Sequence, residues 1–488
     1  MIGTGWGPAL PMEGSLPPDL QGTFFRIGPG AGSGGGAGGD GGGGEGGGGG
    51  AGADGDRDGH GDLPAVTMRR PRGALHAVEL RDGKAVSYLR RESDADAGVF
   101  WHAGSVLALP EAGLPSQYSR LLEPEEFSGG LTVPIASHLH RAAADGSRVL
   151  FAVDDGLDPR GGGDGDGQGA GEPDGIWLRI GEWEAGGGLR SAQSVALERA
   201  TWQHDIGVTA DHVVFIESPT ARLPDGSGMA VPFGWVPGAE GWLGIVRRGG
   251  DGTGVRWFRV DPCLVTHVLG AWEVGPERGG GGGGGEIVLY VCRYDAPEAG
   301  QPVDRTASVV GPYGIGLTAI GGSLGVLERW RIDGNRLERV QVDERHVEYP
   351  RMDALREGAA FRYGYCVEMN WGDGPPGAGP RRGPGRWDTP AAPDGLLKFD
   401  LERNEVAAWN PGPWRNASEP VFVRAADGRS DDEGWLLTVV DDANTGSSHL
   451  YVLDASSMAR GRPEAIIHLP ERLPLRSHGE WVPADRYR

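Results

Sequence analysis

Short apolar stretches follow one another along most of this chain, and short turns join them. Apolar and polar residues alternate within them, as in ALHAVELRDGKAVSYLRR at residues 74–91 and GVLERWRIDGNRLERVQV at 325–342. A period of two is typical of strands, and Asp-Gly turns between such runs indicate β-hairpins. Few segments carry a helical period. The sequence therefore predicts an all-β fold of successive hairpins, and the pattern alone does not fix their number.

Glycine is unusually frequent, with 90 Gly among 488 residues, far above ordinary globular usage. Much of the excess lies at residues 30–62, which we expect to be a Gly-rich disordered insertion, because this stretch buries too little apolar surface to offset its chain entropy. Shorter tracts at 161–171, 279–285 and 372–385 fall between strand-like runs, as loop insertions do. We therefore expect one domain over residues 1–488.

The formal net charge of −22 argues against nucleic-acid binding and against a polybasic membrane anchor. The sequence holds no apolar run of about 18 residues, and its first residues lack the features of a signal peptide. The three cysteines show no Cys-x-x-Cys spacing, which favours reduced thiols. We expect a soluble protein of the cytoplasm or the plastid stroma.

Four similar segments each carry a candidate metal-binding histidine. They are PIASHLHR with His138, TWQHDIGV with His204, PCLVTHVLGAWE with His267 and LPLRSHGEWV with His478. The gaps of 66, 63 and 211 residues between them exclude a zinc finger or a one-helix motif. Such ligands must come from separate elements that converge, as the inner strands of a radial β architecture do. His140 competes with His138, because residues two apart share one face of an extended segment.

Together with GTFFRIGPG at 22–30 and SHGEW at 477–481, these segments resemble the carotenoid cleavage oxygenases, nearly from end to end. The resemblance implies a seven-bladed β-propeller with one Fe(II) per chain, bound by His138, His204, His267 and His478. It favours His138 over His140, because Ser-His-Leu stands where the family has Ala-His-Pro. Two positions depart from the family pattern: Ile27 and Gly270 stand where the family usually has Asn.

Three glutamates lie in segments that also resemble the family: Glu111 in LALPEAGLP, Glu348 in HVEYPRMD and Glu419 in NASEPVFV. The resemblance implies that they hold the iron-binding histidines through the outer ring nitrogens, as carboxylates commonly do at metal sites. We expect no catalytic residue beyond the metal centre. With an all-histidine inner set, three nearby carboxylates balance the metal charge and leave positions open for O2.

The implied reaction is cleavage of a carbon–carbon double bond of a carotenoid or apocarotenoid by O2, which gives aldehyde or ketone products. A substrate of this kind is small, apolar and conjugated, and it partitions into lipid, so the resemblance also implies peripheral contact with a membrane. Stilbene cleavage is an alternative, although family members of that type are expected to pair Tyr with Lys, and this chain has only Lys84 and Lys398. Further alternatives are an isomerase, a non-enzymatic binding propeller and a Ca²⁺- or Zn²⁺-dependent propeller hydrolase.

Overall fold

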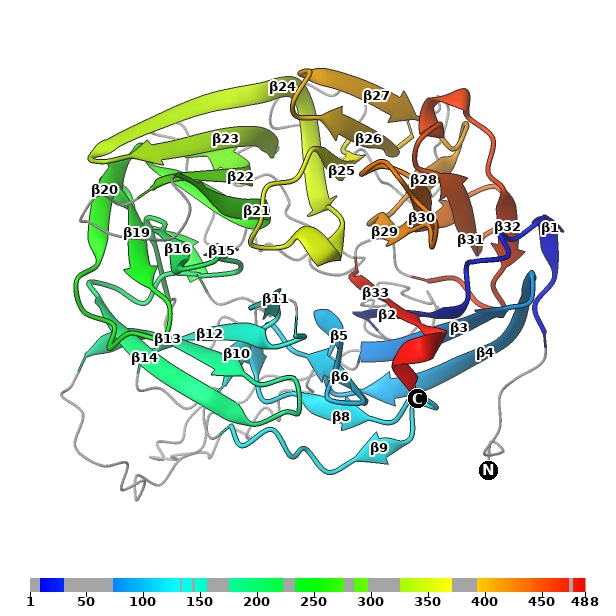
Figure 1. Cartoon of the computed structure of the whole chain (residues 1–488), viewed down its shortest axis with the longest axis horizontal. Helices are drawn as coiled ribbons and strands as arrows, with labels where there is room; N and C mark the ends of the chain where they lie inside the picture. Colours follow the sequence, from blue (N-terminus) through cyan, green and yellow to red (C-terminus); the bar gives the residue numbers. More distant parts are fainter. Residues whose placement is uncertain are drawn as a thin grey trace, which may run out of the picture.

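The computed structural model describes residues 9–29, 73–131, 134–142, 145–155, 175–222, 233–275, 285–296, 325–370, 393–473 and 477–487. Its strands form sheets arranged radially around a central axis (Figure 1). The described residues contain no α-helix and three short 3-10 helices, which are η2 (Ala354–Arg356), η3 (Met458–Arg460) and η4 (Ala484–Tyr487).

Within the described residues, strand pairing defines seven antiparallel blades. Their order around the ring is β33-β2-β3-β4, β5-β6-β8-β9, β11-β12-β13-β14, β15-β16-β19-β20, β21-β22-β23-β24, β24-β25-β26-β27 and β28/β29-β30-β31-β32. The expected all-β, seven-bladed propeller is confirmed.

The strands up to residue 197 build most of the first three blades and their connections, and β1 among them pairs with β32 of the last blade. They are β1 (Met12–Gly14), β2 (Gly22–Pro29), β3 (Gly73–Arg81), β4 (Lys84–Ser93), β5 (Gly98–His102), β6 (Ser105–Leu109), β7 (Ala112–Gly113), β8 (Ser116–Tyr118), β9 (Pro124–Glu125), β10 (Ile135–Ala136), β11 (His140–Arg141), β12 (Arg148–Asp154), β13 (Ile176–Trp183) and β14 (Leu189–Leu197).

The middle blades and their connections contain β15 (Gly207–Val208), β16 (His212–Glu217), β17 (Thr220–Arg222), β18 (Phe233–Trp235), β19 (Gly241–Arg247), β20 (Arg256–Val260), β21 (Cys263–Val274), β22 (Glu286–Asp295), β23 (Val326–Asp333) and β24 (Arg336–Arg351). The last strands are β25 (Tyr363–Glu368), β26 (Gly395–Asp400), β27 (Glu405–Trp409), β28 (Arg415–Ala417), β29 (Val421–Arg424), β30 (Gly434–Asp442), β31 (Ser447–Asp454), β32 (Ala465–His468) and β33 (Gly479–Pro483).

The expected hairpins are present, and β3 with β4 is one of them. β3 and β4 are joined through Asp82 and Gly83, whose φ angles of 52° and 72° belong to the left-handed region of a tight hairpin turn. β3 is buried along almost its whole length, whereas β14 at a blade edge is mostly exposed or half-buried. Side chains of the neighbouring blades pack against both faces of β3, so both faces carry apolar residues.

Two features close the ring and bring distant residues to the axis. The C-terminal strand β33 pairs with β2, so residues from both ends of the chain build one blade. The 16-residue strand β24 is the outer strand of one blade and continues as the inner strand of the next. Apolar side chains fill the spaces between blades, for example Tyr365 and Trp409 against Leu436 and Tyr451.

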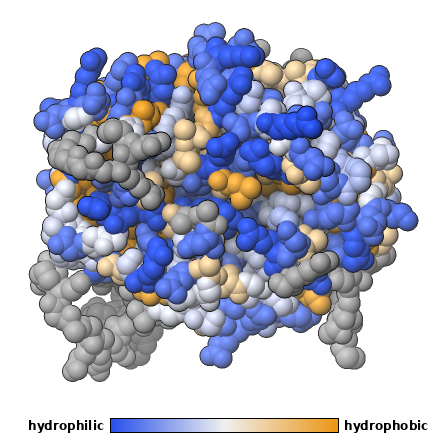
Figure 2. Space-filling view, in the orientation of Figure 1, coloured by the Kyte–Doolittle hydropathy of each residue, from blue (hydrophilic) through white to orange (hydrophobic). Residues whose placement is uncertain are grey.

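The remaining expectations concern the surface and the loops. Residues 30–62 and the three shorter Gly tracts lie wholly or largely outside the described residues, so their state stays a prediction. Cys263, Cys292 and Cys366 are free thiols and buried. The face seen in Figure 2 is mostly hydrophilic, with smaller hydrophobic areas between. Among the described residues, no helix has the length and apolar character that crossing a membrane requires.

Candidate metal centre

The four candidate histidines come from four blades and sit at or beside inner strands. His138 lies between β10 and β11, His204 precedes β15, His267 lies within β21, and His478 directly precedes β33. The pairing register of β21 shifts on both sides of Val268, next to His267. A local bulge of this kind re-aims a side chain out of the regular ladder.

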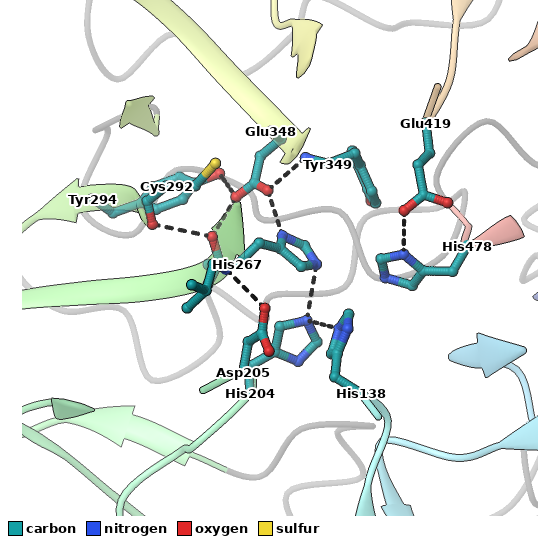
Figure 3. A network of polar contacts seen from close by, with 12 residues as sticks. His138, His204, Asp205, His267, Cys292, Tyr294, Glu348, Tyr349, Glu419 and His478 are labelled. Atoms are coloured by element: carbon teal, nitrogen blue, oxygen red, sulfur yellow. Dashed lines mark hydrogen bonds and ion pairs between the residues drawn. The ribbon is translucent and has the colours of Figure 1, made fainter. Parts of the chain in front are cut away.

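The four side chains meet at one point near the axis (Figure 3). One ring nitrogen from each lies within 4.8 Å of the others. The Nε2 atom of His204 is 3.2 Å from that of His138 and 3.2 Å from that of His267. Within the described residues, this group contains histidines and no carboxylate.

The outer ring nitrogen of three of these histidines faces a glutamate. His204 Nδ1 lies 2.6 Å from Glu111 Oε1, and His267 Nδ1 lies 2.6 Å from Glu348 Oε2. His478 Nδ1 lies 2.8 Å from Glu419 Oε1. The structure thus brings together all seven residues named from the sequence, and their roles toward a metal remain a prediction.

The carboxylates decide which ring nitrogen carries the proton. A carboxylate only accepts hydrogen bonds, so each of the three imidazoles donates its Nδ1–H outward and turns a bare Nε2 lone pair inward. Two bare acceptors 3.2 Å apart, as in His204 and His267, repel each other unless a cation lies between them. Nitrogens bound to one metal ion at about 2.1 Å lie about 3.0 Å apart at a right angle, so the donor set fits a metal.

The environment of the glutamates keeps them ionised. Burial raises the pKa of the Glu348 carboxyl, but the electrostatic attraction of His267 and the hydrogen bonds from His267, Thr266 and Tyr294 outweigh burial and bring the pKa to about 2. Burial acts in the same way on Glu419, where the charge of Arg351 is the largest opposing effect and the pKa is again about 2. Each of these two glutamates therefore brings a full negative charge to the back of its histidine.

His140 lies beside the centre but is engaged elsewhere. Its Nε2 is 2.6 Å from Asp205 Oδ1 and its Nδ1 is 2.7 Å from Glu357 Oε1. Asp205 Oδ2 also accepts the backbone N–H of Val268 at 2.7 Å, which ties the His204 segment to the strand of His267. Of the two competing histidines, His138 belongs to the inner group and His140 supports the frame around it.

Two aromatic residues beside the centre were not singled out from the sequence. The Trp202 indole N–H donates to Glu111 Oε1 at 2.8 Å, and its ring lies 5.2 Å from that of His204. The Tyr349 ring lies 5.4 Å from His267 and 5.5 Å from His478, measured between ring centroids. Tyr349 has a φ of 53°, a conformation that costs about 1–3 kcal/mol in a non-glycine residue and is common at functional sites. The sequence pattern pointed to the nearby residues His204 and Glu348, and not to Trp202 or Tyr349 themselves.

Comparison with known proteins gives a consistent family. A family model described as retinal pigment epithelial membrane protein matches residues 57–483. A carotenoid cleavage oxygenase of Mycobacterium tuberculosis is 26% identical, covering 84% of this chain and 86% of that protein. An isoeugenol monooxygenase of Pseudomonas nitroreducens is 25% identical, covering 80% of this chain and 75% of that protein.

A carotenoid 9,10(9',10')-cleavage dioxygenase 1 of Pisum sativum is 25% identical over 62% of this chain and 52% of that protein. The chain thus spans about half the length of this relative. Among solved structures, a lignostilbene dioxygenase of Pseudomonas brassicacearum superposes with a TM-score of 0.70 at 22% identity, covering 98% of this chain and 95% of the other. A cobalt-substituted Synechocystis apocarotenoid oxygenase gives 0.69 at 19% identity, covering 98% of both. At these identities the two structures establish the fold.

Proposed function

The chain belongs to the retinal pigment epithelial membrane protein family, which is the carotenoid oxygenase family, and from this membership we propose that it is an Fe(II)-dependent dioxygenase. It cleaves a carbon–carbon double bond of a carotenoid or apocarotenoid with O2 and releases aldehyde or ketone products. The observation that carries the proposal is the convergence of four imidazoles, three of which have a carboxylate behind the outer nitrogen.

The proposed metal is one Fe(II) per chain, held by His138, His204, His267 and His478. When bound, Fe(II) supplies the site at which O2 is activated. Many other iron oxygenases bind the metal with two histidines and one carboxylate. Here the proposed ligands are four neutral imidazoles, and the carboxylates that balance the metal charge contact the outer nitrogens of three of them. A relative crystallised in cobalt-substituted form supports a metal-binding role for this fold.

The protein groups around the metal hold the imidazoles in place and exclude water. Glu111, Glu348 and Glu419 each fix one ring by accepting its Nδ1–H. The Trp202 and Tyr349 rings cover the sides of the neighbouring imidazoles. Sites for apolar, conjugated substrates are lined mostly by apolar and aromatic side chains of this kind, with few polar groups.

A phenolic substrate with a conjugated double bond is the second candidate. Isoeugenol monooxygenase and lignostilbene dioxygenase are among the similar proteins, and their names indicate such compounds. The positions of the two lysines argue against activation of a phenol by lysine. Lys84 is exposed at the start of β4, and Lys398 donates to Asp432 Oδ2 at 2.6 Å and to the carbonyl of Ala455 at 2.9 Å. We therefore rank the apocarotenoid first.

The test is product analysis by mass spectrometry after aerobic incubation of the Fe(II)-loaded protein with an apocarotenal, resveratrol or isoeugenol. Shortened polyene aldehydes, formed by wild type and absent with His267→Ala, support the first candidate, and their masses locate the bond that is cut. Hydroxybenzaldehydes or vanillin as the only products establish the second candidate. No product from any of these substrates, with iron bound, contradicts the dioxygenase proposal.

A further inference from the structure

A second pair of histidines lies on the last blade and does not belong to the four-histidine group. His449 in β31 and His468 in β32 are directly opposite each other in the antiparallel register. Opposite side chains on one face of such a pair have Cβ atoms about 5 Å apart, close enough to bind one ion together. Their rings lie 4.9 Å apart between centroids and nearly perpendicular, at 88°.

The two rings turn the same type of nitrogen toward each other. His449 Nδ1 and His468 Nδ1 are 3.0 Å apart. This separation equals the spacing of about 3.0 Å expected for two nitrogens at about 2.1 Å from one ion with a right angle between them. Such angles are preferred by the square-planar and octahedral ions Cu²⁺ and Ni²⁺.

The terminal strand β1 sets the tautomer of one ring. Glu13 Oε1 lies 3.1 Å from His468 Nε2, so His468 donates Nε2–H to the carboxylate and presents a bare Nδ1 lone pair to His449. Without a metal, a proton on His449 Nδ1 fills the space between the rings, and His449 Nε2 accepts a hydrogen bond from Ser447 Oγ at 3.1 Å.

A metal ion can replace that proton without a change in the backbone. The His449 proton then moves to Nε2 and is donated to Ser447 Oγ, whose hydroxyl turns toward Thr445 Oγ1, 2.5 Å away. No proton is lost overall, because His449 only changes tautomer. Every polar atom in this chain of contacts has a partner both with and without the metal ion. The exchange therefore carries no free-energy cost for an unsatisfied polar group.

Solvent reaches the histidine pair, and the neighbouring charges favour a bound cation. The His468 side chain is 35% exposed and the Glu13 side chain 69% exposed, so the site opens to solvent. The charge of Asp442 on β30 raises the pKa of His449 and the charge of Arg415 on β28 lowers it. These two residues form an ion pair with each other at 2.8 Å. Their charges offset, and Glu13 leaves a net negative charge beside the pair.

From these contacts we propose that His449 and His468 form a second metal site, specific for a divalent transition-metal ion that prefers nitrogen ligands, with Glu13 as the group that orients His468. Copper(II) and nickel(II) bind most tightly by the general order of affinity, and zinc(II) more weakly than copper(II). An ion there links β31 to β32 and, through Glu13, to β1. It stabilises the folded chain in proportion to its occupancy.

The test is equilibrium dialysis of the full-length, iron-free protein against NiCl2, followed by metal analysis. We expect wild type to bind one Ni²⁺ more per chain than either His449→Gln or His468→Ala. His346→Ala, which removes an exposed histidine of β24, is the matched control and keeps the wild-type count. The four-histidine centre is the same in wild type and in every variant. Whether or not it binds nickel, the expected difference of one Ni²⁺ between wild type and the His449 or His468 variants is therefore the same.

Thermal unfolding gives a second, independent measurement. Addition of NiCl2 raises the unfolding midpoint of wild type and His346→Ala by a larger amount than that of His468→Ala, and circular dichroism checks that the variants fold. Equal nickel counts in wild type, His449→Gln and His468→Ala overturn the proposal and leave the pair as a hydrogen-bonded contact between two strands.

Discussion

Nδ1 of His267 lies 2.6 Å from Oε2 of Glu348, and the other oxygen of this carboxylate accepts hydrogen bonds from Thr266 and Tyr294. The carboxylate is therefore held in place by groups that do not belong to the metal centre. It fixes the orientation of His267 and increases the basicity of the nitrogen that faces inward.

We expect Glu348→Gln to weaken metal binding by about 10- to 100-fold, because the amide keeps the shape of the side chain but not its charge. The measurement is the metal affinity of the folded protein in competition with a chelator. Glu273→Gln is the matched control, since Glu273 pairs with His212 at 3.1 Å in the same manner outside the four-histidine group. Equal affinities in wild type and Glu348→Gln would remove Glu348 from the centre.

Variants of His138 and His140 should separate metal binding from folding. His138→Ala should lose most of the bound metal and leave the free energy of unfolding of the metal-free chain nearly unchanged, because it removes only one of four facing imidazoles. His140→Ala leaves the buried carboxylate of Asp205 and the half-buried carboxylate of Glu357 without their shared partner. Breaking a buried ion pair costs about 3–5 kcal/mol, which denaturant unfolding would detect. The assignment is wrong if metal loss follows His140 instead.

Sequence reasoning predicted the fold well because its signals are local. Alternation and turns give the strands, and the four histidine segments repeat a recognisable pattern at inner strands. The contacts around His140 were not predictable in this way, because Glu357 and Asp205 lie 217 and 65 residues away from it in the sequence. The choice between His138 and His140 depended on which ring faces the axis. That direction follows from the packing of three blades. The spacing of residues in PIASHLHR left both histidines open, and only the resemblance of Ser-His-Leu to the family's Ala-His-Pro favoured His138.

Acid should destabilise the protein through His76 as well as through carboxylates. Burial, with the charges of Arg90 and Arg26, lowers the pKa of His76 to about 3. The unfolded chain has an ordinary histidine pKa of about 6.5, so it binds the proton first as the pH falls. The contribution of His76 to stability is therefore complete above pH 6.5 and is lost progressively between pH 6.5 and 3, by about 1.4 kcal/mol per pH unit.

His76→Gln tests this directly, because glutamine is neutral throughout. We expect its free energy of unfolding, measured in urea, to fall less steeply between pH 6.5 and 4 than that of wild type. His346→Gln, which makes the same replacement at an exposed position, is the matched control. Identical slopes for all three proteins would mean that His76 takes up its proton equally in the folded and unfolded chains.

Gly270 has a packing reason for the absence of a side chain. A Cβ atom at this position would lie 2.6 Å from Cε1 of Phe361 and 3.0 Å from Cε of Met352. The Phe361 ring, which also packs 5.2 Å from the ring of Trp272, occupies the space that a side chain at 270 would need. We expect Gly270→Ala to destabilise the fold by about 1–3 kcal/mol, as overpacking of a core usually does.

The double variant Gly270→Ala with Phe361→Leu distinguishes overpacking from a loss of backbone freedom. Leucine vacates part of the ring volume, so the double variant should be more stable than the sum of the two single effects predicts, by a coupling of about 0.5–3 kcal/mol in urea unfolding. Gly186→Ala is the control, because a Cβ there meets no atom within 4 Å. Strict additivity would show that Phe361 is not the obstacle. The stability loss at Gly270 would then come from the β21 backbone itself, whose irregular register lies next to His267.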